Sequence, residues 1–268
     1  MRQAWPGDAV RREPPGSAGS HDRGRRRHVR PRRRGLPSRG SGDHWRLRGV
    51  GWAREAATLL ILDPDSGRLW SAERAVAALA EHSDLAGDPA DDVVVPTAGT
   101  AIAGESPVRR AELEARRTLL RAAQISGAIR GCYDITRRYT SEREQFGKPL
   151  NAFPDVQRHL VELAQAAAIT QLAVWRAAHA HALAPTDLTV VRLPKMIADL
   201  QAKEAIRCAH QAHGAIGMTR EYPLHRLTRR LHTWSLDNSD ESPSQGLADA
   251  VVQRGSLTRF VWNPGWPS

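Results

Sequence analysis

Three long segments with the apolar periodicity of an α-helix constrain the fold of this chain more than any other feature. The first starts after Ser106 and Pro107, a pair that suits the N-cap and first position of a helix, and it contains no further proline until Pro149. Small residues along it, such as Gly127, let a neighbouring helix approach closely. We expect one long helix that ends near Gly147 and Pro149.

The second and third segments, at about 154–183 and 187–213, carry apolar residues at spacings of three, four and seven. Pro185 separates them, and the third stops at Gly214. Long amphipathic helices with short connections favour an up-down bundle. The expected fold class is therefore mainly α, with a C-terminal four-helix up-down bundle in residues 105–268.

Short strand patterns precede the helical segments. Residues 45–50 and 57–62 have the composition of strands, with turn-forming residues at 63–67, and 93–95 is an apolar run closed by a proline. Three or four strands make a sheet smaller than most independent β domains. We therefore expect residues 43–104 to form a partial β domain.

Most of the net charge of +10 lies in an N-terminal tract. Residues 1–40 contain 12 Arg, no Lys and 3 acidic residues, whereas the other 228 residues carry 27 basic and 26 acidic groups. Because this tract has little apolar surface to offset the entropy of ordering, we expect residues 1–42 to be disordered. A nucleic-acid-binding arm is one interpretation. We favour a tail without a binding role, or a misassigned start of the coding sequence, because no aromatic side chains interleave with the arginines.

The two cysteines and the hydropathy exclude several classes of protein. Cys132 and Cys208 fall within helical patterns and lack the spacing of a metal site or a disulfide framework. We expect both to be small buried hydrophobes, and no metal. No apolar run approaches the ~20 residues that span a bilayer, and the N-terminus lacks the apolar core of a signal peptide. The expected location is the cytoplasm, without a membrane partner.

One segment with possible chemistry lies between the first two helical patterns. Residues 139–150 read Tyr-Thr-Ser-Glu-Arg-Glu-Gln-Phe-Gly-Lys-Pro-Leu. The guanidinium of Arg143 can grip phosphate in a bidentate way, and an aromatic ring, Phe146, and a glycine follow it closely. This combination suits a nucleotide diphosphate. The alternative is a surface Arg, a buried Phe and a helix C-cap glycine.

A second such segment follows the third helical pattern. Residues 210–223 read His-Gln-Ala-His-Gly-Ala-Ile-Gly-Met-Thr-Arg-Glu-Tyr-Pro. The glycines at 214 and 217 would let a ligand approach the backbone closely. Most turns of this kind, however, bind nothing.

Together, in this order and separation, the two segments resemble the acyl-CoA dehydrogenase family. Its members carry an Arg-x-x-Phe-Gly turn, then a Gln-x-x-Gly-Gly-x-Gly turn and a Glu-Tyr-Pro. The resemblance covers residues 107–234, about half the chain, and 43–100 is more vaguely similar to the family's middle domain. The segment 224–231 resembles short, divergent members that form one half of unequal subunit pairs.

The resemblance implies FAD as the cofactor, bound between the middle sheet and the helical bundle and held in part by a neighbouring subunit. The implied cofactor-binding residues are Arg143, Phe146, Gln211, Gly214 and Ala215. The implied partners are an acyl-CoA substrate, an electron-transferring flavoprotein that reoxidises the flavin, and further subunits in a homo- or hetero-oligomer. Degradation of a fatty acid or a steroid side chain is the implied process.

The family reaction removes an α proton to a carboxylate while the β hydrogen leaves as hydride to the flavin, which yields a 2-enoyl-CoA. Here the two positions at which family members carry that carboxylate correspond to Asn238 and Arg117. Asp237 is the best candidate for a catalytic base, although it and its acidic neighbours could instead cap the next helix. A flavin-contacting Gln of the family corresponds to Pro154, and residues 1–42 have no likeness to the family's N-terminal helical domain.

These departures leave three hypotheses for the function. The chain is an FAD-dependent acyl-CoA dehydrogenase that uses Asp237, or a non-catalytic or truncated subunit that donates flavin-contacting turns to a partner. The alternative is a helical interaction protein with a basic nucleic-acid-binding arm, for which binding would fall steeply with salt. We favour the subunit, and consider a nucleic-acid partner the weakest of the three.

Overall fold

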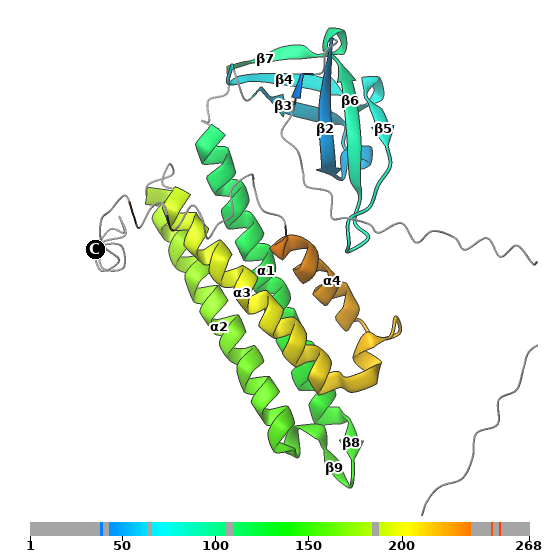
Figure 1. Cartoon of the computed structure of the whole chain (residues 1–268), viewed down its shortest axis with the longest axis vertical. Helices are drawn as coiled ribbons and strands as arrows, with labels where there is room; N and C mark the ends of the chain where they lie inside the picture. Colours follow the sequence, from blue (N-terminus) through cyan, green and yellow to red (C-terminus); the bar gives the residue numbers. More distant parts are fainter. Residues whose placement is uncertain are drawn as a thin grey trace, which may run out of the picture. The chain divides into compact units, whose positions relative to one another are not determined.

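The computed structural model of the chain describes residues 38–39, 43–63, 66–105, 110–183 and 188–236, with two isolated positions beyond them (Figure 1). Except for the short strand at 38–39, the Arg-rich tract lies outside the described residues, and so does the proposed nucleic-acid arm within it. The described part consists of a β region followed by a helical region.

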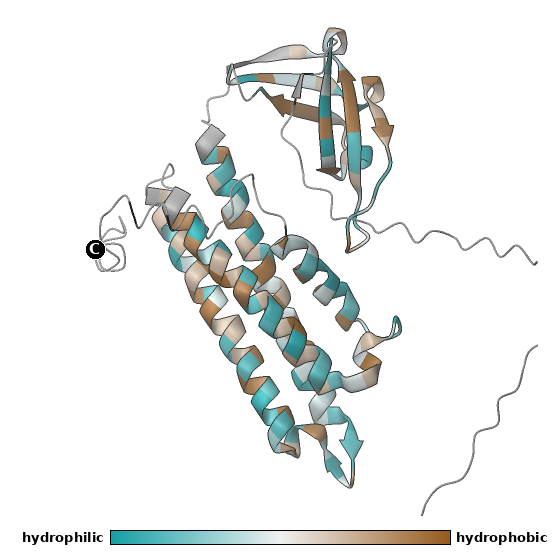
Figure 2. Cartoon of the chain, in the orientation of Figure 1, coloured by the Kyte–Doolittle hydropathy of each residue, from teal (hydrophilic) through white to brown (hydrophobic). Residues whose placement is uncertain are grey.

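The β region consists of two antiparallel sheets. One has the strand order β1-β2-β6-β5 and the other the order β3-β4-β7. Figure 2 shows that β3 and β6 are largely apolar. The strands are β1 (Ser38–Arg39), β2 (His44–Gly51), β3 (Thr58–Leu62), β4 (Arg68–Glu73), β5 (Ala78–Ala80), β6 (Ala90–Pro96) and β7 (Ala101–Glu105).

Alternation along the strands builds the core between the sheets. Trp45 of β2 and Val95 of β6 are buried, while their strand neighbours Arg46 and Val94 are exposed. Ile61 of β3 belongs to the same apolar cluster. The period of two that marks a half-buried strand is therefore present in the structure.

The sheet region holds more strands than the three or four expected. The predicted strands correspond to β2, β3 and β6, but β4, β5 and β7 were missed. These three strands are short or lack a run of branched apolar residues, so their pairing comes from tertiary contacts and not from local propensity. The expected turn at 63–67 is confirmed, since Gly67 donates its N–H to the carbonyl of Asp63 at 3.0 Å and has φ +68°.

The expected mainly α fold with a C-terminal helical bundle is confirmed. Helices α1, α2 and α3 run side by side in alternating directions, and α4 packs against α1 and α3 (Figure 1). The bounds are α1 (Arg110–Glu142), α2 (Pro154–Leu183), α3 (Leu188–His213) and α4 (Leu224–Ser235). Among the described residues, no helix combines the length and the apolarity that a membrane crossing requires.

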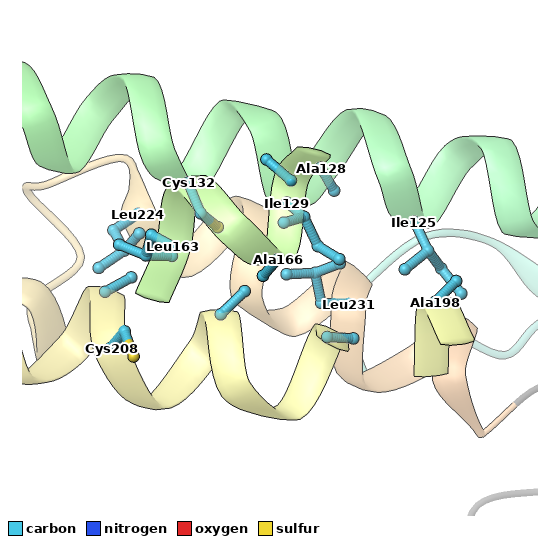
Figure 3. Close-up of a cluster of buried hydrophobic side chains, with 14 of the residues drawn as sticks. Ile125, Ala128, Ile129, Cys132, Leu163, Ala166, Ala198, Cys208, Leu224 and Leu231 are labelled. Atoms are coloured by element: carbon cyan, nitrogen blue, oxygen red, sulfur yellow. The ribbon is translucent and has the colours of Figure 1, made fainter. Parts of the chain in front are cut away.

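The bundle core is built from small and branched residues of all four helices (Figure 3). Ile129 of α1, Leu163 of α2 and Leu231 of α4 are fully buried, and alanines such as Ala202 of α3 fill the space between helices. The alanines let the helix axes approach closely, as the small residues in the sequence suggested. Both cysteines, at positions 132 and 208, are buried and free, in agreement with their expected role as small hydrophobes.

The first helix ends earlier than expected. Its last residue is Glu142, and not a residue near Gly147, because the chain turns into a small hairpin of β8 (Glu144–Gln145) and β9 (Lys148–Pro149). The glycine that resembled a helix stop lies at the tip of that hairpin. Pro154 occupies the first position of α2, where a missing backbone N–H costs no hydrogen bond.

Candidate functional site

A two-residue hairpin presents the first of the two turns. Gln145 pairs with Lys148 across the hairpin, so that Phe146 and Gly147 form its tip. Both have positive φ, 53° and 75°, as the central residues of a type I′ turn do. Glycine adopts this backbone freely, but a phenylalanine there is strained by about 1–3 kcal/mol.

Phe146 points away from the chain. Its side chain is 92% exposed, and its only ring contact within the described residues is an edge-to-face one with Phe153, at 6.3 Å between centroids. The alternative of a buried Phe at this position is therefore wrong. The hairpin tip therefore presents a strained and exposed aromatic ring.

Arg143 lies at the foot of the same hairpin. Its backbone N–H closes the last turn of α1 on the carbonyl of Tyr139 at 2.9 Å, and its carbonyl accepts from the N–H of Leu150 at 2.9 Å. Its side chain is exposed and, in the part of the chain that the structure describes, takes part in no ion pair. The backbone is thus fixed on both sides while the guanidinium stays available for an anion.

The second turn follows the end of α3. Gln211 is exposed in its last turn, and the 3₁₀ helix η5 (Gly214–Met218) begins directly after it. Gly214 has φ +61°, and a Cβ there would meet nothing within 4 Å. A Cβ at Gly217, by contrast, would lie 2.9 Å from the Cβ of His213. The first glycine is therefore required by its backbone conformation, and the second by close packing.

An aromatic cluster joins the two turns. The ring of His213, at the end of α3, stacks on Tyr139 near the end of α1, with 4.5 Å between centroids. Tyr222, just before α4, lies 4.9 Å from His213 and 5.5 Å from Tyr139. The cluster holds three chain segments together at the end of the bundle that carries the hairpin.

A buried histidine, His213, and a half-buried one, His210, support this end of the bundle. The Nδ1–H of His213 donates to the carbonyl of Ala209 at 2.7 Å, and His210 Nε2 lies 3.2 Å from the hydroxyl of Thr228. Burial lowers the pKa of both histidines below the ordinary value, and it raises the pKa of Tyr222. Both imidazoles are therefore neutral in the folded chain at neutral pH.

These histidines should make the stability of the bundle depend on pH. As the pH falls from about 7.5 to about 5.5, histidines in the unfolded chain take up protons, whereas His210 and His213 in the folded chain resist protonation because their pKa values are lowered. The unfolded state then binds more protons, so the free energy of unfolding decreases. We expect His213→Phe, which keeps a ring beside Tyr139, to flatten this dependence in denaturant titrations. An unchanged slope would show that His213 does not contribute.

The structure places the five predicted cofactor-binding residues at two exposed turns. Within the described residues, no hydrogen bond or ring contact joins them directly. Their link is the aromatic cluster defined above. The predicted cofactor-binding residues are Arg143, Phe146, Gln211, Gly214 and Ala215, all exposed.

Of the candidate catalytic positions, the structure describes only Arg117. Asp237 and Asn238 lie outside the described residues, directly after the exposed Leu236 that follows α4. Arg117, at the other base position of the family, is exposed on α1. Pro154 opens α2, so the residue that replaces the family's Gln has a structural role in this chain.

Sequence reasoning did not assign a role to the three rings of the aromatic cluster, although all three stand in or beside the quoted motifs. Tyr139, His213 and Tyr222 are separated in the chain by about 70 and about 10 residues. Their stacking depends on how the ends of α1 and α3 meet, which no local pattern records.

Comparison with known proteins relates the helical region to a protein family. Residues 107–235 match the family model "Acyl-CoA dehydrogenase, C-terminal domain". The chain is 30% identical over 211 residues to acyl-CoA dehydrogenase IpdE2 of Mycobacterium tuberculosis, an alignment that covers 66% of this chain and 64% of the relative.

Solved structures show the same fold. The chain superposes on a variant of the Tcur3481-Tcur3483 steroid ACAD with a TM-score of 0.68 at 25% identity, covering 80% of this chain and 61% of the other. It superposes on the ChsE4-ChsE5 complex from Mycobacterium tuberculosis with a TM-score of 0.64 at 20% identity, covering 87% and 63%.

The chain spans less than two thirds of the length of each of these proteins. The likeness nevertheless includes the helical region and the two turns at its end, which fall within the matched residues. The helical region therefore belongs to the acyl-CoA dehydrogenase family, as its C-terminal domain.

Proposed function

We propose that the chain is a subunit of an FAD-dependent acyl-CoA dehydrogenase assembly, to which it contributes the turns at 143–147 and 211–215. The assembly catalyses α,β-dehydrogenation of an acyl-CoA thioester. The observation that carries the proposal is Phe146, which is strained and 92% exposed at a hairpin tip. A partner that covers the ring would remove from water the apolar surface that is exposed in the free chain, which favours association.

The residues of both turns fit the adenine and pyrophosphate end of FAD. Arg143 would donate to phosphate oxygens in the bidentate manner of a guanidinium, and Phe146 would pack against the adenine. Gly214 leaves its backbone open to close approach, and Gln211 supplies an amide beside it. When bound, the flavin accepts the hydride that leaves the substrate. Pro154 offers no side-chain hydrogen bond where the family has one.

Exposed apolar side chains on the helices support a partner subunit. Figure 2 shows apolar as well as polar residues along α2. Leu172 and Trp175 of this helix are 59% and 66% exposed, and Leu200 of α3 is 55% exposed. Apolar surface of this kind commonly marks a protein interface. A second acyl-CoA dehydrogenase chain is the proposed partner, in keeping with the names of the paired structural relatives.

The catalytic base is proposed to come from the partner, because Asn238 and Arg117 occupy the family's base positions in this chain. We therefore expect Asp237→Asn to change acyl-CoA-dependent reduction of the flavin in the assembled complex by less than about twofold. Loss of a positioned base lowers the rate by about 10²–10⁴-fold. The measurement is anaerobic stopped-flow bleaching of the flavin after mixing with acyl-CoA.

A loss of about 100-fold or more in Asp237→Asn would identify Asp237 as the base and this chain as the catalytic subunit. The matched variant is Asp240→Asn, which removes a neighbouring carboxylate. Substituting the base carboxylate of the partner chain should abolish bleaching under our proposal. In the functioning assembly, an electron-transferring flavoprotein would reoxidise the flavin.

A further inference from the structure

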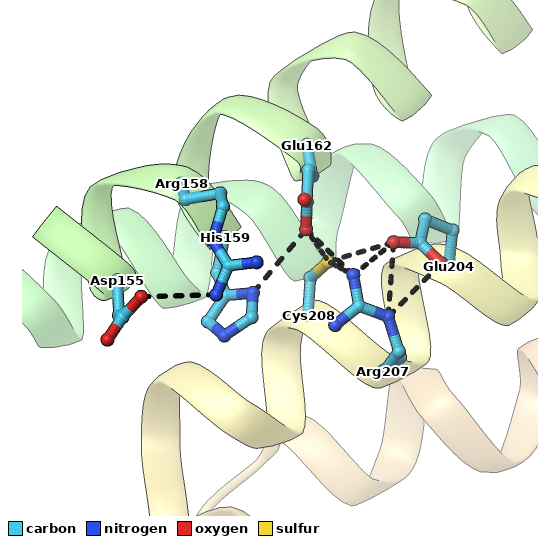
Figure 4. A network of polar contacts seen from close by, with 7 residues as sticks. All are labelled: Asp155, Arg158, His159, Glu162, Glu204, Arg207 and Cys208. Atoms are coloured by element: carbon cyan, nitrogen blue, oxygen red, sulfur yellow. Dashed lines mark hydrogen bonds and ion pairs between the residues drawn. The ribbon is translucent and has the colours of Figure 1, made fainter.

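A polar network between α2 and α3 brings together three different metal-ligating side chains (Figure 4). His159 and Glu162 stand one helical turn apart on α2, and Cys208 lies opposite them on α3. Cys208 is fully buried, whereas the side chains of His159 and Glu162 are 12% and 28% exposed. The group thus has a buried end and an end that solvent reaches.

The donor atoms lie at distances close to those of a metal site. The Sγ of Cys208 is 3.0 Å from Oε2 of Glu162, and Nδ1 of His159 is 3.4 Å from the same oxygen. All three donor atoms lie within 4.8 Å of one another. Tetrahedral zinc ligands at about 2.0–2.3 Å from the metal are separated by roughly 3.3–3.8 Å. The two distances to the Glu162 oxygen lie within about half an ångström of this range, whereas Nδ1 of His159 and Sγ of Cys208, which lie within 4.8 Å of each other, would have to approach by up to about 1 Å.

We propose that His159, Glu162 and Cys208 bind a divalent metal ion of the zinc type through one imidazole nitrogen, one carboxylate oxygen and one thiolate sulfur. Mixed nitrogen, oxygen and sulfur donors suit Zn²⁺, which accepts all three in four-coordinate sites. Glu204 stands beside the group, with its Oε1 3.5 Å from the Cys208 sulfur, and can supply a fourth ligand. The site is independent of the proposed function in flavin binding.

In the metal-free chain, the guanidinium of Arg207 contacts the groups that would bind the metal ion. Its guanidinium donates to Glu162 at 2.7 Å and to the sulfur of Cys208 at 3.2 Å, and it also pairs with Glu204. Its side chain is 45% exposed, so it can swing into solvent without crossing the core. The metal and the guanidinium therefore compete for the same three acceptors.

The protonation states of Cys208 and Glu162 in the metal-free chain determine how many protons metal binding releases. Burial, reinforced by the hydrogen bond to Glu162, raises the pKa of the Cys208 thiol well above its usual value. The hydrogen bonds from Cys208 and Arg207 lower the pKa of Glu162 to about 2. The carboxylate is thus ready to ligate at neutral pH, whereas the thiol must give up its proton. Binding should release about one proton per metal ion.

The test is titration of the untagged, chelator-treated full-length chain with Co²⁺, followed by competition with Zn²⁺. We expect one equivalent of Co²⁺ to produce the visible bands of a four-coordinate ion and a thiolate-to-cobalt charge-transfer band in the near ultraviolet. Zn²⁺ should displace it stoichiometrically, and a pH dye in weak buffer should report the proton. Zn²⁺ affinity is measured by competition with a chromophoric chelator.

The chain offers a matched control for the sulfur ligand, because Cys132 is the other buried cysteine of the bundle core. Cys208→Ala should remove the charge-transfer band and weaken Zn²⁺ binding by at least about tenfold, whereas Cys132→Ala should retain both. His159→Gln, at the exposed end, should weaken binding to a similar extent. Arg207→Gln should strengthen binding, because it removes the competing cation.

Absence of the charge-transfer band in the wild-type chain would overturn the proposal. So would equal affinity for Zn²⁺ in the wild type, Cys208→Ala and His159→Gln, since the metal would then be bound elsewhere. Circular dichroism of each metal-free variant checks that it folds. If Cys208→Ala does not fold, His159→Gln and Arg207→Gln still decide the matter, because their expected effects on affinity have opposite signs.

Discussion

Replacing Arg143 with alanine is expected to lower the FAD affinity of the assembled complex by about 10- to 100-fold. Charge-assisted hydrogen bonds to phosphate have no substitute when the guanidinium is removed. The exposed side chain takes part in no ion pair within the described residues, so the unfolding midpoint of the chain should stay the same. The measurement is equilibrium FAD binding to the deflavinated complex, followed by the quenching of flavin fluorescence.

Arg137 provides the control for that experiment. It is an exposed arginine of α1, close to Arg143 in the chain but outside the hairpin. Arg137→Ala should keep the wild-type affinity for FAD. Equal affinities for wild type and Arg143→Ala would remove the first turn from the proposed cofactor site. Equal losses in both variants would point to a general effect of positive charge.

Leu163→Ala should lower the free energy of unfolding of the helical region by about 2–5 kcal/mol. Leu163 is fully buried in the bundle core, where it packs among residues of the other helices (Figure 3). Truncation removes apolar surface from the core and leaves a cavity that the helices fill only in part. Urea titration, followed by circular dichroism, gives the change in free energy.

Leu172→Ala is the same chemical change on the exposed face of the same helix. Its side chain is 59% exposed, so the expected change in the isolated chain is within about 0.5 kcal/mol. A large loss in Leu172→Ala that depends on protein concentration would show that this face is covered by another copy. A small loss in Leu163→Ala would contradict the described core.

The helical region could be predicted from the sequence because its signals are local. The apolar period of the three long segments gave α2 and α3 nearly their observed bounds, and α3 ends at His213, directly before the predicted break at Gly214. The β region was less predictable. Strands β5 and β7 pair with residues more than ten positions away in the chain, and β4, although it pairs with β3 across the predicted turn, has no run of branched apolar residues.

The candidate site was predictable in its motifs but not in its geometry. The motif at 139–150 indicated a ligand-binding turn, yet its residues could equally have buried Phe146 under a helix end. The hairpin that exposes the ring requires positive φ at Phe146, which sequence rules assign to Gly or Asn. The meeting of Cys208 with His159 and Glu162 depends on the register between two helices, so the cysteine spacing alone predicted no metal.

The most direct test of the account is the flavin content of the complex. The chain is co-expressed with a full-length acyl-CoA dehydrogenase from the same genome and purified through a tag on this chain. The account predicts a yellow complex with stoichiometric FAD, as measured by its visible absorbance. A colourless chain that is recovered without a partner would contradict the shared cofactor site and leave only the family fold.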